Sequence, residues 1–151
     1  MFKRTVLTVV SAAAVAAGLA AAAAPAQAAL GECPGNRMCL WFNSGYDGAR
    51  ADFAIADGSM ANELFNDGPA GRNGWKVQVE DNAASAANRT GEIVVLYARR
   101  NCDPAGKTAT FFPGEEFNLA NPMFEIKNQV SSLYVYNGPN FNCVNVDSNG
   151  Y

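Results

Sequence analysis

Beyond residue 29, apolar residues come in short runs or alternate with polar ones, and the spacing of an amphipathic helix is hard to find. Clusters of Gly, Asn, Asp and Pro separate these runs, as at 43–45 and 66–69. Short apolar runs bounded by turn residues are typical of strands joined by hairpins. The pattern predicts an all-β sandwich of antiparallel strands. The runs expected to form strands are residues 38–42, 75–79, 93–97, 108–112 and 133–136.

One pattern of residues occurs twice along the chain. In both copies an apolar pair opens the unit, and a Phe follows the turn glycine by five residues, which makes Phe53 and Phe111 equivalent. Each copy ends in a polar segment, at 81–85 and at 127–132. A repeat of this size predicts two supersecondary units that share one core. The expected bounds are about 38–90 for the first unit, about 91–137 for the second and 138–151 for a C-terminal tail.

The first copy is about a dozen residues longer than the second. Between the repeated Phe and the polar end, the first copy spans 29 residues and the second spans 17. The extra residues fit most naturally within 61–74, a stretch that is rich in Asn, Gly and Asp. Long loops on a rigid scaffold often carry function, so Leu64 and Phe65 within it are candidate contact residues. A surface insertion without a function is the alternative, with equal weight.

Residues 1–28 have the features of an export signal. Two basic residues open the chain, residues 5–24 are apolar or small, and Ala-Gln-Ala at 26–28 forms a cleavage site. A transmembrane anchor is the alternative, but the run is mostly Ala and no basic stop-transfer cluster follows. The chain is expected to be secreted as one domain of residues 29–151. The Ala-rich leader suggests a bacterial source, so the Asn-Arg-Thr glycosylation sequon at Asn88 receives no weight.

The composition excludes several classes of function. Without the leader, the chain holds nine basic and 14 acidic residues, and this net charge of −5 argues against a nucleic-acid or membrane partner. The absence of histidine removes Ser-His-Asp and Cys-His catalysis and the commonest zinc ligand. Glu115 and Glu116 are the most visible carboxylate pair, but neighbouring residues on a strand point to opposite faces. We expect no enzymatic activity and no required cofactor.

Four cysteines in an exported chain predict two disulfides, for which three pairings are open. A Pro-Gly turn between Cys33 and Cys39 favours a bridge between these two residues. Cys102 and Cys143 then form the second bridge. In the chain-entropy model the short loop contributes about 2–3 kcal/mol and the long loop about 4 kcal/mol.

The loop that the first bridge would close presents Asn36, Arg37 and Met38. A constrained, exposed loop suits a peptidase inhibitor, because its binding costs little ordering entropy. The alternative, which receives more weight for this loop, is a staple that fastens the N-terminus to the first strand.

The polar segments that end the two units are candidate calcium ligands. Calcium takes six to eight oxygen ligands at flexible geometry. The alternative is hydrogen bonding to the local backbone, which Asn and Ser commonly make where a loop meets a strand. The candidate ligands are Asp81, Asn82, Ser85, Asn128 and Ser131.

These features resemble two linked groups of proteins, over nearly all of residues 33–137. The doubled pattern, with Tyr46-Asp47-Gly48 in the first hairpin and a polar segment before the last strand of each unit, is similar to a βγ-crystallin domain of two Greek keys. The opening from Cys33 to Trp41 resembles secreted actinomycete proteins of the peptidase inhibitor family typified by the Streptomyces metalloproteinase inhibitor.

Three residues depart from the crystallin pattern. Ala86 stands where the calcium motif of the first copy has a hydroxyl, and Lys127 stands where that of the second has an acid or amide. Cys102 replaces the aromatic residue of the second hairpin. These departures weaken calcium binding as an expected property.

The resemblance implies a secreted, monomeric inhibitor of an extracellular peptidase, most simply a metallopeptidase, that inserts an exposed loop into the active-site cleft. A weakly calcium-binding structural or stress protein is the alternative. A small killer-type toxin on the same scaffold is the third hypothesis, and it rests on fold analogy alone.

Overall fold

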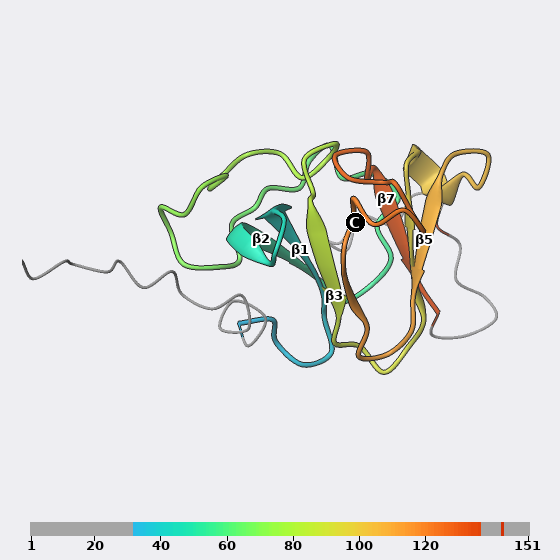
Figure 1. Cartoon of the computed structure of the whole chain (residues 1–151), viewed down its shortest axis with the longest axis horizontal. Helices are drawn as coiled ribbons and strands as arrows, with labels where there is room; N and C mark the ends of the chain where they lie inside the picture. The colour runs from blue at the N-terminus through green and yellow to red at the C-terminus, as the bar shows by residue number, and fades with distance from the viewer. Residues whose placement is uncertain (1–31, 137–142, 144–151) are drawn as a thin grey trace, which may run out of the picture.

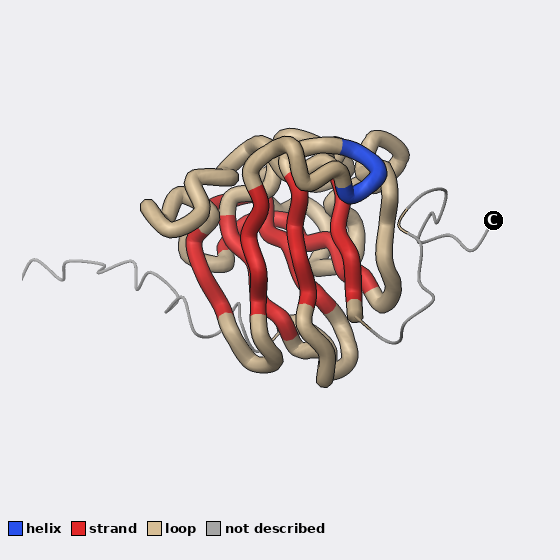
Figure 2. The backbone as a smooth tube through the Cα atoms, turned by 90° about the vertical axis from the view of Figure 1, so that its right-hand side faces the viewer, coloured by secondary structure: helices blue, strands red, loops and turns tan. Residues whose placement is uncertain are grey.

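Two antiparallel sheets form the scaffold of the protein (Figures 1 and 2). The structure is a computed structural model that describes residues 32–136 and Cys143. The expected leader (1–28) and most of the expected tail (138–151) lie outside these described residues. Within the described part of the chain there are seven strands and one short 3-10 helix. No helix there is long and apolar enough to cross a membrane.

The two sheets contain four and three strands. The first sheet has the order β2-β1-β3-β6, and the second has the order β5-β4-β7. The strands of the first sheet are β1 (Met38–Asn43), β2 (Asp47–Phe53), β3 (Ser85–Asn88) and β6 (Glu116–Asn118). Those of the second sheet are β4 (Val94–Tyr97), β5 (Thr108–Phe111) and β7 (Ser132–Val135), and the 3-10 helix η1 (Arg100–Cys102) follows β4.

Each unit of the repeat contributes to the sheet of the other unit. β6 belongs to the second repeat but pairs with β3, where Ala86 lies opposite Phe117. Asp57 of the first repeat forms a bridge with Leu133 of β7, through two backbone hydrogen bonds of 2.9 Å. Each half therefore completes the sheet of the other half. This exchange confirms the predicted all-β sandwich of two Greek-key units.

The core between the sheets is built by simple alternation along the strands. In β5 the exposed Thr108 and Thr110 alternate with the buried Ala109 and Phe111. Phe53, which is equivalent to Phe111 in the repeat, is only 1% exposed. Burial of one such aromatic side chain contributes roughly 2–3 kcal/mol to folding.

A second, smaller apolar cluster lies on the outer face of the first sheet. Cys39 and Trp41 point there, because the residues between and beside them on β1 face the core. Trp41 meets the ring of Tyr46 edge to face, with centroids 5.6 Å apart. The Cys33–Cys39 disulfide holds the N-terminal loop on this outer face.

The second disulfide joins Cys102, the last residue of η1, to Cys143. The described cysteines thus form the two pairs that the spacing favours, and none of them is free.

The prediction of a strand at 75–79 is wrong. Gly74 and Lys76 have φ angles of +86° and +62°, in the left-handed region, and these interrupt an extended backbone. The segment retains a single bridge, between Leu64 and Gln78, and buries Val79 in the core. Its apolar alternation therefore reflects packing rather than pairing in a sheet.

Candidate functional site

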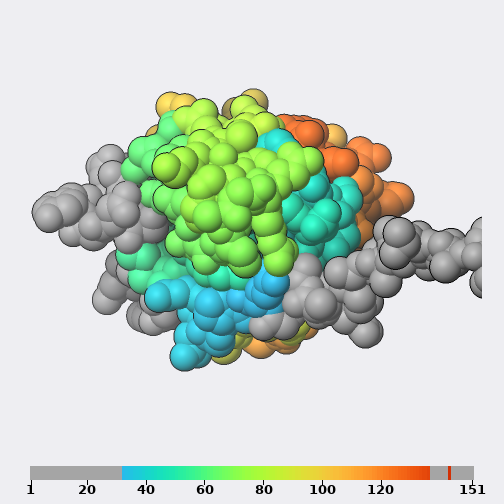
Figure 3. Space-filling model, turned by 90° about the vertical axis from the view of Figure 1, so that its left-hand side faces the viewer, coloured from blue at the N-terminus to red at the C-terminus, as the bar shows by residue number. Residues whose placement is uncertain are grey.

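An open groove lies between the disulfide loop (residues 33–39) and the insertion (residues 61–74). Its volume is about 680 Å³. Figure 3 shows the two segments side by side on one face, the N-terminal residues in blue and the insertion in green. The groove therefore brings together the two loops that the sequence predicts as candidate contact segments. Its lining residues are Pro34, Gly35, Arg37, Asp52, Ala54, Asn62, Glu63, Leu64, Asn66 and Asp67.

The disulfide loop forms one wall of the groove and is fastened at several points. The backbone N–H of Asn36 donates to the carbonyl of Arg89 at 3.0 Å, and the N–H of Arg89 donates to the carbonyl of Arg37 at 2.8 Å. The disulfide closes the loop a few residues away, where Cys39 is fully buried. This wall is therefore anchored both to β1 and to the end of β3.

The insertion forms the other wall and follows the outer edge of β2 (Figure 1). Asp67 N–H donates to the carbonyl of Arg50 at 3.0 Å, and Ala49 N–H donates to the carbonyl of Asn73 at 2.8 Å. Phe65 N–H donates to the carbonyl of Val77 at 2.9 Å, which ties the insertion to the segment that follows it. The insertion satisfies an otherwise open strand edge, so it is a fixed part of the scaffold.

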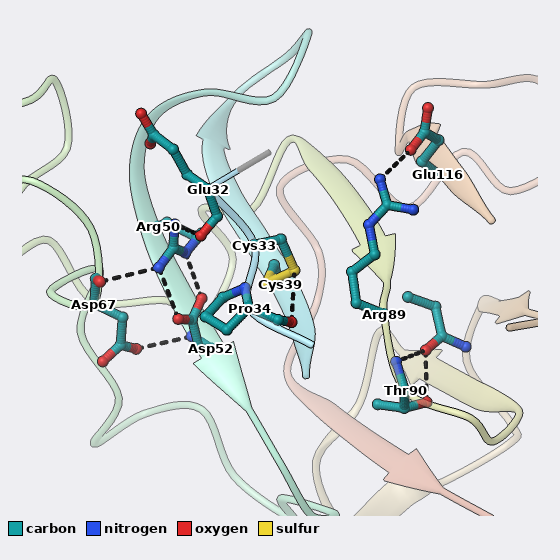
Figure 4. The surroundings of a disulfide bond; sticks show 11 residues. Glu32, Cys33, Pro34, Cys39, Arg50, Asp52, Asp67, Arg89, Thr90 and Glu116 are labelled. Atoms are coloured by element: carbon teal, nitrogen blue, oxygen red, sulfur yellow. Dashed lines mark hydrogen bonds and ion pairs between the residues drawn. A yellow bond between two sulfur atoms is a disulfide. The ribbon is translucent and has the colours of Figure 1, made fainter. Parts of the chain in front are cut away.

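Arg50 lies beneath the groove on the outer face of β2 and is only 5% exposed. Its Nε and Nη2 donate to the two carboxylate oxygens of Asp52, at 2.5 and 2.8 Å. Its Nη2 also donates to the carbonyl of Asp67 at 3.1 Å, and its Nη1 donates to the carbonyl of Glu32 (Figure 4). One guanidinium thus contacts β2, the insertion and the segment that precedes the disulfide loop.

The groove has an acidic character, since Asp52, Glu63 and Asp67 line it and Arg37 is the one basic residue among its lining. Burial raises the pKa of Asp52 above its usual range, and the charge of Asp67 acts in the same direction. The hydrogen bond and the charge of Arg50 oppose this shift of the Asp52 pKa. Arg50 therefore favours the ionised form of a carboxyl group that burial disfavours.

The five residues predicted as inhibitory contacts divide into accessible and buried positions. Met38 and Phe65 are 0% exposed, so their side chains belong to the core and do not reach a partner. Asn36 is exposed and Arg37 is partly exposed on the disulfide loop. Leu64 is 37% exposed at the groove, because it points away from its buried neighbour Phe65. Contact by these loops therefore rests on Asn36, Arg37 and Leu64.

The candidate calcium ligands lie at three places. Ser131 Oγ lies 3.4 Å from Oδ1 of Asp81, although the two residues are 50 positions apart. Asn82 and Asn128 line a separate hollow together with Lys127. Ser85 is fully buried, where its hydroxyl donates to the carbonyl of Asn43 and accepts from the N–H of Tyr46.

The first of these places is the one that brings a carboxylate and a hydroxyl together, and these two ligands are fewer than the six to eight that calcium takes. Asp81 supplies a carboxylate beside the hydroxyl of Ser131, whereas Lys127 opposes a cation in the hollow of Asn82 and Asn128. The hydroxyl of Ser85 already has both a donor and an acceptor in the backbone. The described residues contain no cluster of three or more His, Cys, Asp or Glu side chains that could hold a metal ion.

The sequence interpretation missed Arg50, Asp52 and Asp67. Arg50 and Asp52 are two residues apart in a strand, so their side chains lie on the same face. That spacing was a usable signal of a pair. The contribution of Asp67 arises only from tertiary structure, because the insertion returns to the edge of β2.

Comparisons with known proteins agree with this fold and with the family suggested by the sequence. Among solved structures, the chain is similar to one from work on the evolution of the eye lens βγ-crystallin domain fold, with a TM-score of 0.54, 10% identity, and coverage of 70% of this chain and 91% of that one. The N-terminal domain of protein S has a TM-score of 0.48 and 18% identity, with 68% and 98% of the two chains covered. A βγ-crystallin from an archaeon has a TM-score of 0.48 and 13% identity, with 68% and 99% covered.

No curated protein matches the sequence. The model of the peptidase inhibitor family I36 matches residues 26–111, which is more than half of the chain. The match includes the disulfide loop, β2 and the whole insertion, and therefore every residue that lines the groove. The chain belongs to peptidase inhibitor family I36, on a fold of the βγ-crystallin type.

Proposed function

We propose that this chain inhibits an extracellular metallopeptidase by placing the two walls of the groove, with Leu64 as the apolar anchor, in the active-site cleft of the enzyme. The observation that carries the proposal is the position of Leu64. It is the one large apolar side chain that the described residues expose at the groove, and it lies on a segment that backbone hydrogen bonds hold in place. Family membership supports inhibition as the activity.

Rigidity of the two walls supports this mechanism. An inhibitor must occupy the cleft without becoming a good substrate, and a segment that is already ordered loses little entropy on binding. Val79 N–H donates to the carbonyl of Glu63 at 2.9 Å, and Phe65 is held on both its N–H and its carbonyl, so Leu64 lies between two anchored residues. Its side chain can therefore enter a pocket while its backbone stays fixed.

The acidic residues at the groove support a metallopeptidase as the target. A catalytic zinc keeps a coordination position open for an oxygen ligand, and carboxylates bind zinc well. Glu63 directly precedes Leu64 in the sequence, Asp67 follows it three positions later, and both line the same groove. The resemblance to the Streptomyces metalloproteinase inhibitor supports the same class of target.

The test is a panel of purified peptidases of the thermolysin, subtilisin and papain types, each assayed with micromolar protein. We expect inhibition of the thermolysin type and a loss of about ten-fold or more in affinity for Leu64→Ala, which is the size of a hot-spot truncation. Met123→Ala is the matched control, because Met123 is 75% exposed but does not line the groove. Absence of inhibition of every class would overturn the proposal.

Weak calcium binding at Asp81 and Ser131 is the second candidate function, and the approach of these two distant residues favours it. A ligand that binds only the folded state raises the melting temperature. We expect millimolar calcium to raise the melting temperature and Asp81→Asn to abolish the rise. Lys127→Gln is the control, since Lys127 lies at the other hollow. An identical melting curve with and without calcium would exclude this candidate.

A further inference from the structure

Arg50 carries a buried charge. Neither a surface ion pair nor the backbone pairing of β2 explains why this side chain is buried. It is 5% exposed and lies on the outer face of β2, the face that carries the small apolar cluster. A buried guanidinium is tolerated only when its donors find partners. Its partners are therefore informative about the arrangement of the surrounding segments.

Those partners come from three separate segments of the chain. Asp52, two residues along β2, accepts two hydrogen bonds and fixes the plane of the guanidinium. The carbonyl of Asp67 accepts from the insertion side, and the carbonyl of Glu32 accepts from the side of the disulfide loop. The two walls of the groove are thus joined through a single planar group (Figure 4).

Asp67 strengthens this connection by binding the backbone of β2 as well. Its carboxylate Oδ2 accepts from the N–H of Asp52 at 2.8 Å, and its N–H donates to the carbonyl of Arg50 at 3.0 Å. The backbone of the insertion is therefore fixed on both sides of the Arg50 side chain. A second link, between Arg72 and Glu32 at 2.7 Å, joins the same two walls nearer the solvent.

We propose that Arg50 is the positioning residue of the two groove walls: it sets the separation of the disulfide loop and the insertion and holds Leu64 in its binding orientation. This inference rests on the proposed function. Arg50 does not line the groove, so it acts through Asp67 and Glu32 rather than by touching the peptidase. A lysine cannot replace it, because an ammonium lacks the planar fork that serves several acceptors at once.

The test compares Arg50→Lys with Arg100→Lys. Arg100 also makes a bidentate pair, with Glu80 at 2.8 and 2.6 Å, but neither residue lines the groove. We expect Arg50→Lys to weaken inhibition by about ten-fold, because the loosened walls must be ordered again on binding. Amide hydrogen exchange should accelerate at residues 66–73 and stay unchanged in β4 and β7. Arg100→Lys should change neither property.

Each outcome bears on a different part of the inference. Unchanged exchange at 66–73 in a folded Arg50→Lys protein would overturn the positioning role, and so would an equal effect of Arg100→Lys. If the unsubstituted protein inhibits no peptidase, the proposed function fails, while the exchange pattern still decides the role of Arg50. If Arg50→Lys does not fold, Asp52→Asn, which removes one charge but keeps an acceptor, should show the same local acceleration at a smaller size.

Discussion

Gly74 lies against the ring of Phe42, so closely that a Cβ on residue 74 would stand 2.6 Å from both the Cβ and the Cδ1 of Phe42. Gly74 also has a φ of +86°, which side-chain-bearing residues rarely adopt. Phe42 in turn meets the ring of Phe65 edge to face, with centroids 5.7 Å apart. The end of the insertion is therefore fixed to the core by a contact that only glycine permits.

Substitution of Gly74 by Ala should destabilise the protein more than the same change at Gly71. Gly71 has a similar φ of +81° but open space around its missing Cβ, so Gly71→Ala should cost about 1 kcal/mol from backbone strain alone. Gly74→Ala adds overpacking against Phe42, for a total of about 2–4 kcal/mol. Urea unfolding of the two variants measures the difference. Equal costs would show that Phe42 moves aside freely.

Leu64 and Phe65 should respond in opposite ways to truncation. Phe65 is fully buried, and Phe65→Ala should cost about 3–5 kcal/mol of the free energy of unfolding. Leu64→Ala should change the unfolding free energy by less than about 1 kcal/mol, since its side chain is 37% exposed, but it should weaken inhibition. Urea unfolding and an inhibition assay on the same two proteins separate the roles. A stability loss at Leu64 as large as that at Phe65 would contradict this division.

Asn88 should be a structural residue and not a glycosylation site, although it begins a sequon. It is fully buried; its amide donates to the carbonyls of Glu92 and Phe111 at 2.8 and 3.0 Å, and its Oδ1 accepts from the N–H and the hydroxyl of Thr90. Asn88→Ala leaves these groups unpaired and should cost about 2–3 kcal/mol. Asn118→Ala, which removes one exposed hydrogen bond to Gly45, should cost about 1 kcal/mol or less. Thermal unfolding of both variants tests the comparison, and a neutral Asn88→Ala would refute it.

Much of the fold follows from the sequence because it depends on local alternation. Phe53 and Phe111 occupy equivalent places in the repeat, and both are buried as that equivalence predicts. Residues 75–79 alternate equally well yet form turns: Lys76 has a left-handed backbone, and its N–H donates to the carbonyl of Phe65 in the insertion rather than to a neighbouring strand. β6 contains a single apolar residue, Phe117, so no apolar run marks it, and its place beside β3 depends on the exchange between units.

The candidate site was only partly predictable for a related reason. The disulfide loop and the insertion stand out by composition and length, and they do meet at one groove. The same reasoning treated Met38 and Phe65 as contacts, because a loop in the sequence does not show which of its side chains turn inward. Arg50 carries no local sign of burial, since the segments that cover it precede and follow β2 in the chain.

Removal of the Cys33–Cys39 disulfide should loosen one wall of the groove and leave the two sheets intact. The bridge joins residues that are six positions apart, for which chain entropy gives about 2 kcal/mol. In the double substitution Cys33→Ala and Cys39→Ala, the backbone bond from Asn36 to Arg89 remains and limits the effect. We expect faster proteolytic cleavage at 34–37, lower stability in urea, and weaker inhibition. Unchanged cleavage at this loop would show that the backbone bonds alone fix the wall.

The dependence of stability on pH should separate Asp52 from Asp103. The pKa of Asp52 is raised, chiefly by burial, so above the ordinary carboxyl pKa the native state keeps a proton that the unfolded chain has lost. Stability from this group therefore falls as the pH rises toward the raised pKa of Asp52. The pKa of Asp103 is lowered by the N–H of Ala105 and by Arg99, so its contribution is present above the ordinary carboxyl pKa and is lost as the pH falls through the lowered value.

The two Asn substitutions should consequently change the slope of stability against pH in opposite directions. Asp52→Asn removes a decrease with pH, so the melting temperature should rise more steeply between about pH 3 and about pH 7 than in the unsubstituted protein. Asp103→Asn removes an increase, so the same curve should become shallower. Asp52→Asn also removes a charged partner of Arg50, which lowers stability at every pH. This loss does not obscure the result, because each comparison uses the slope of the curve. Parallel curves for all three proteins would mean that Asp52 titrates normally, and that Arg50 then overcomes the burial of this carboxylate.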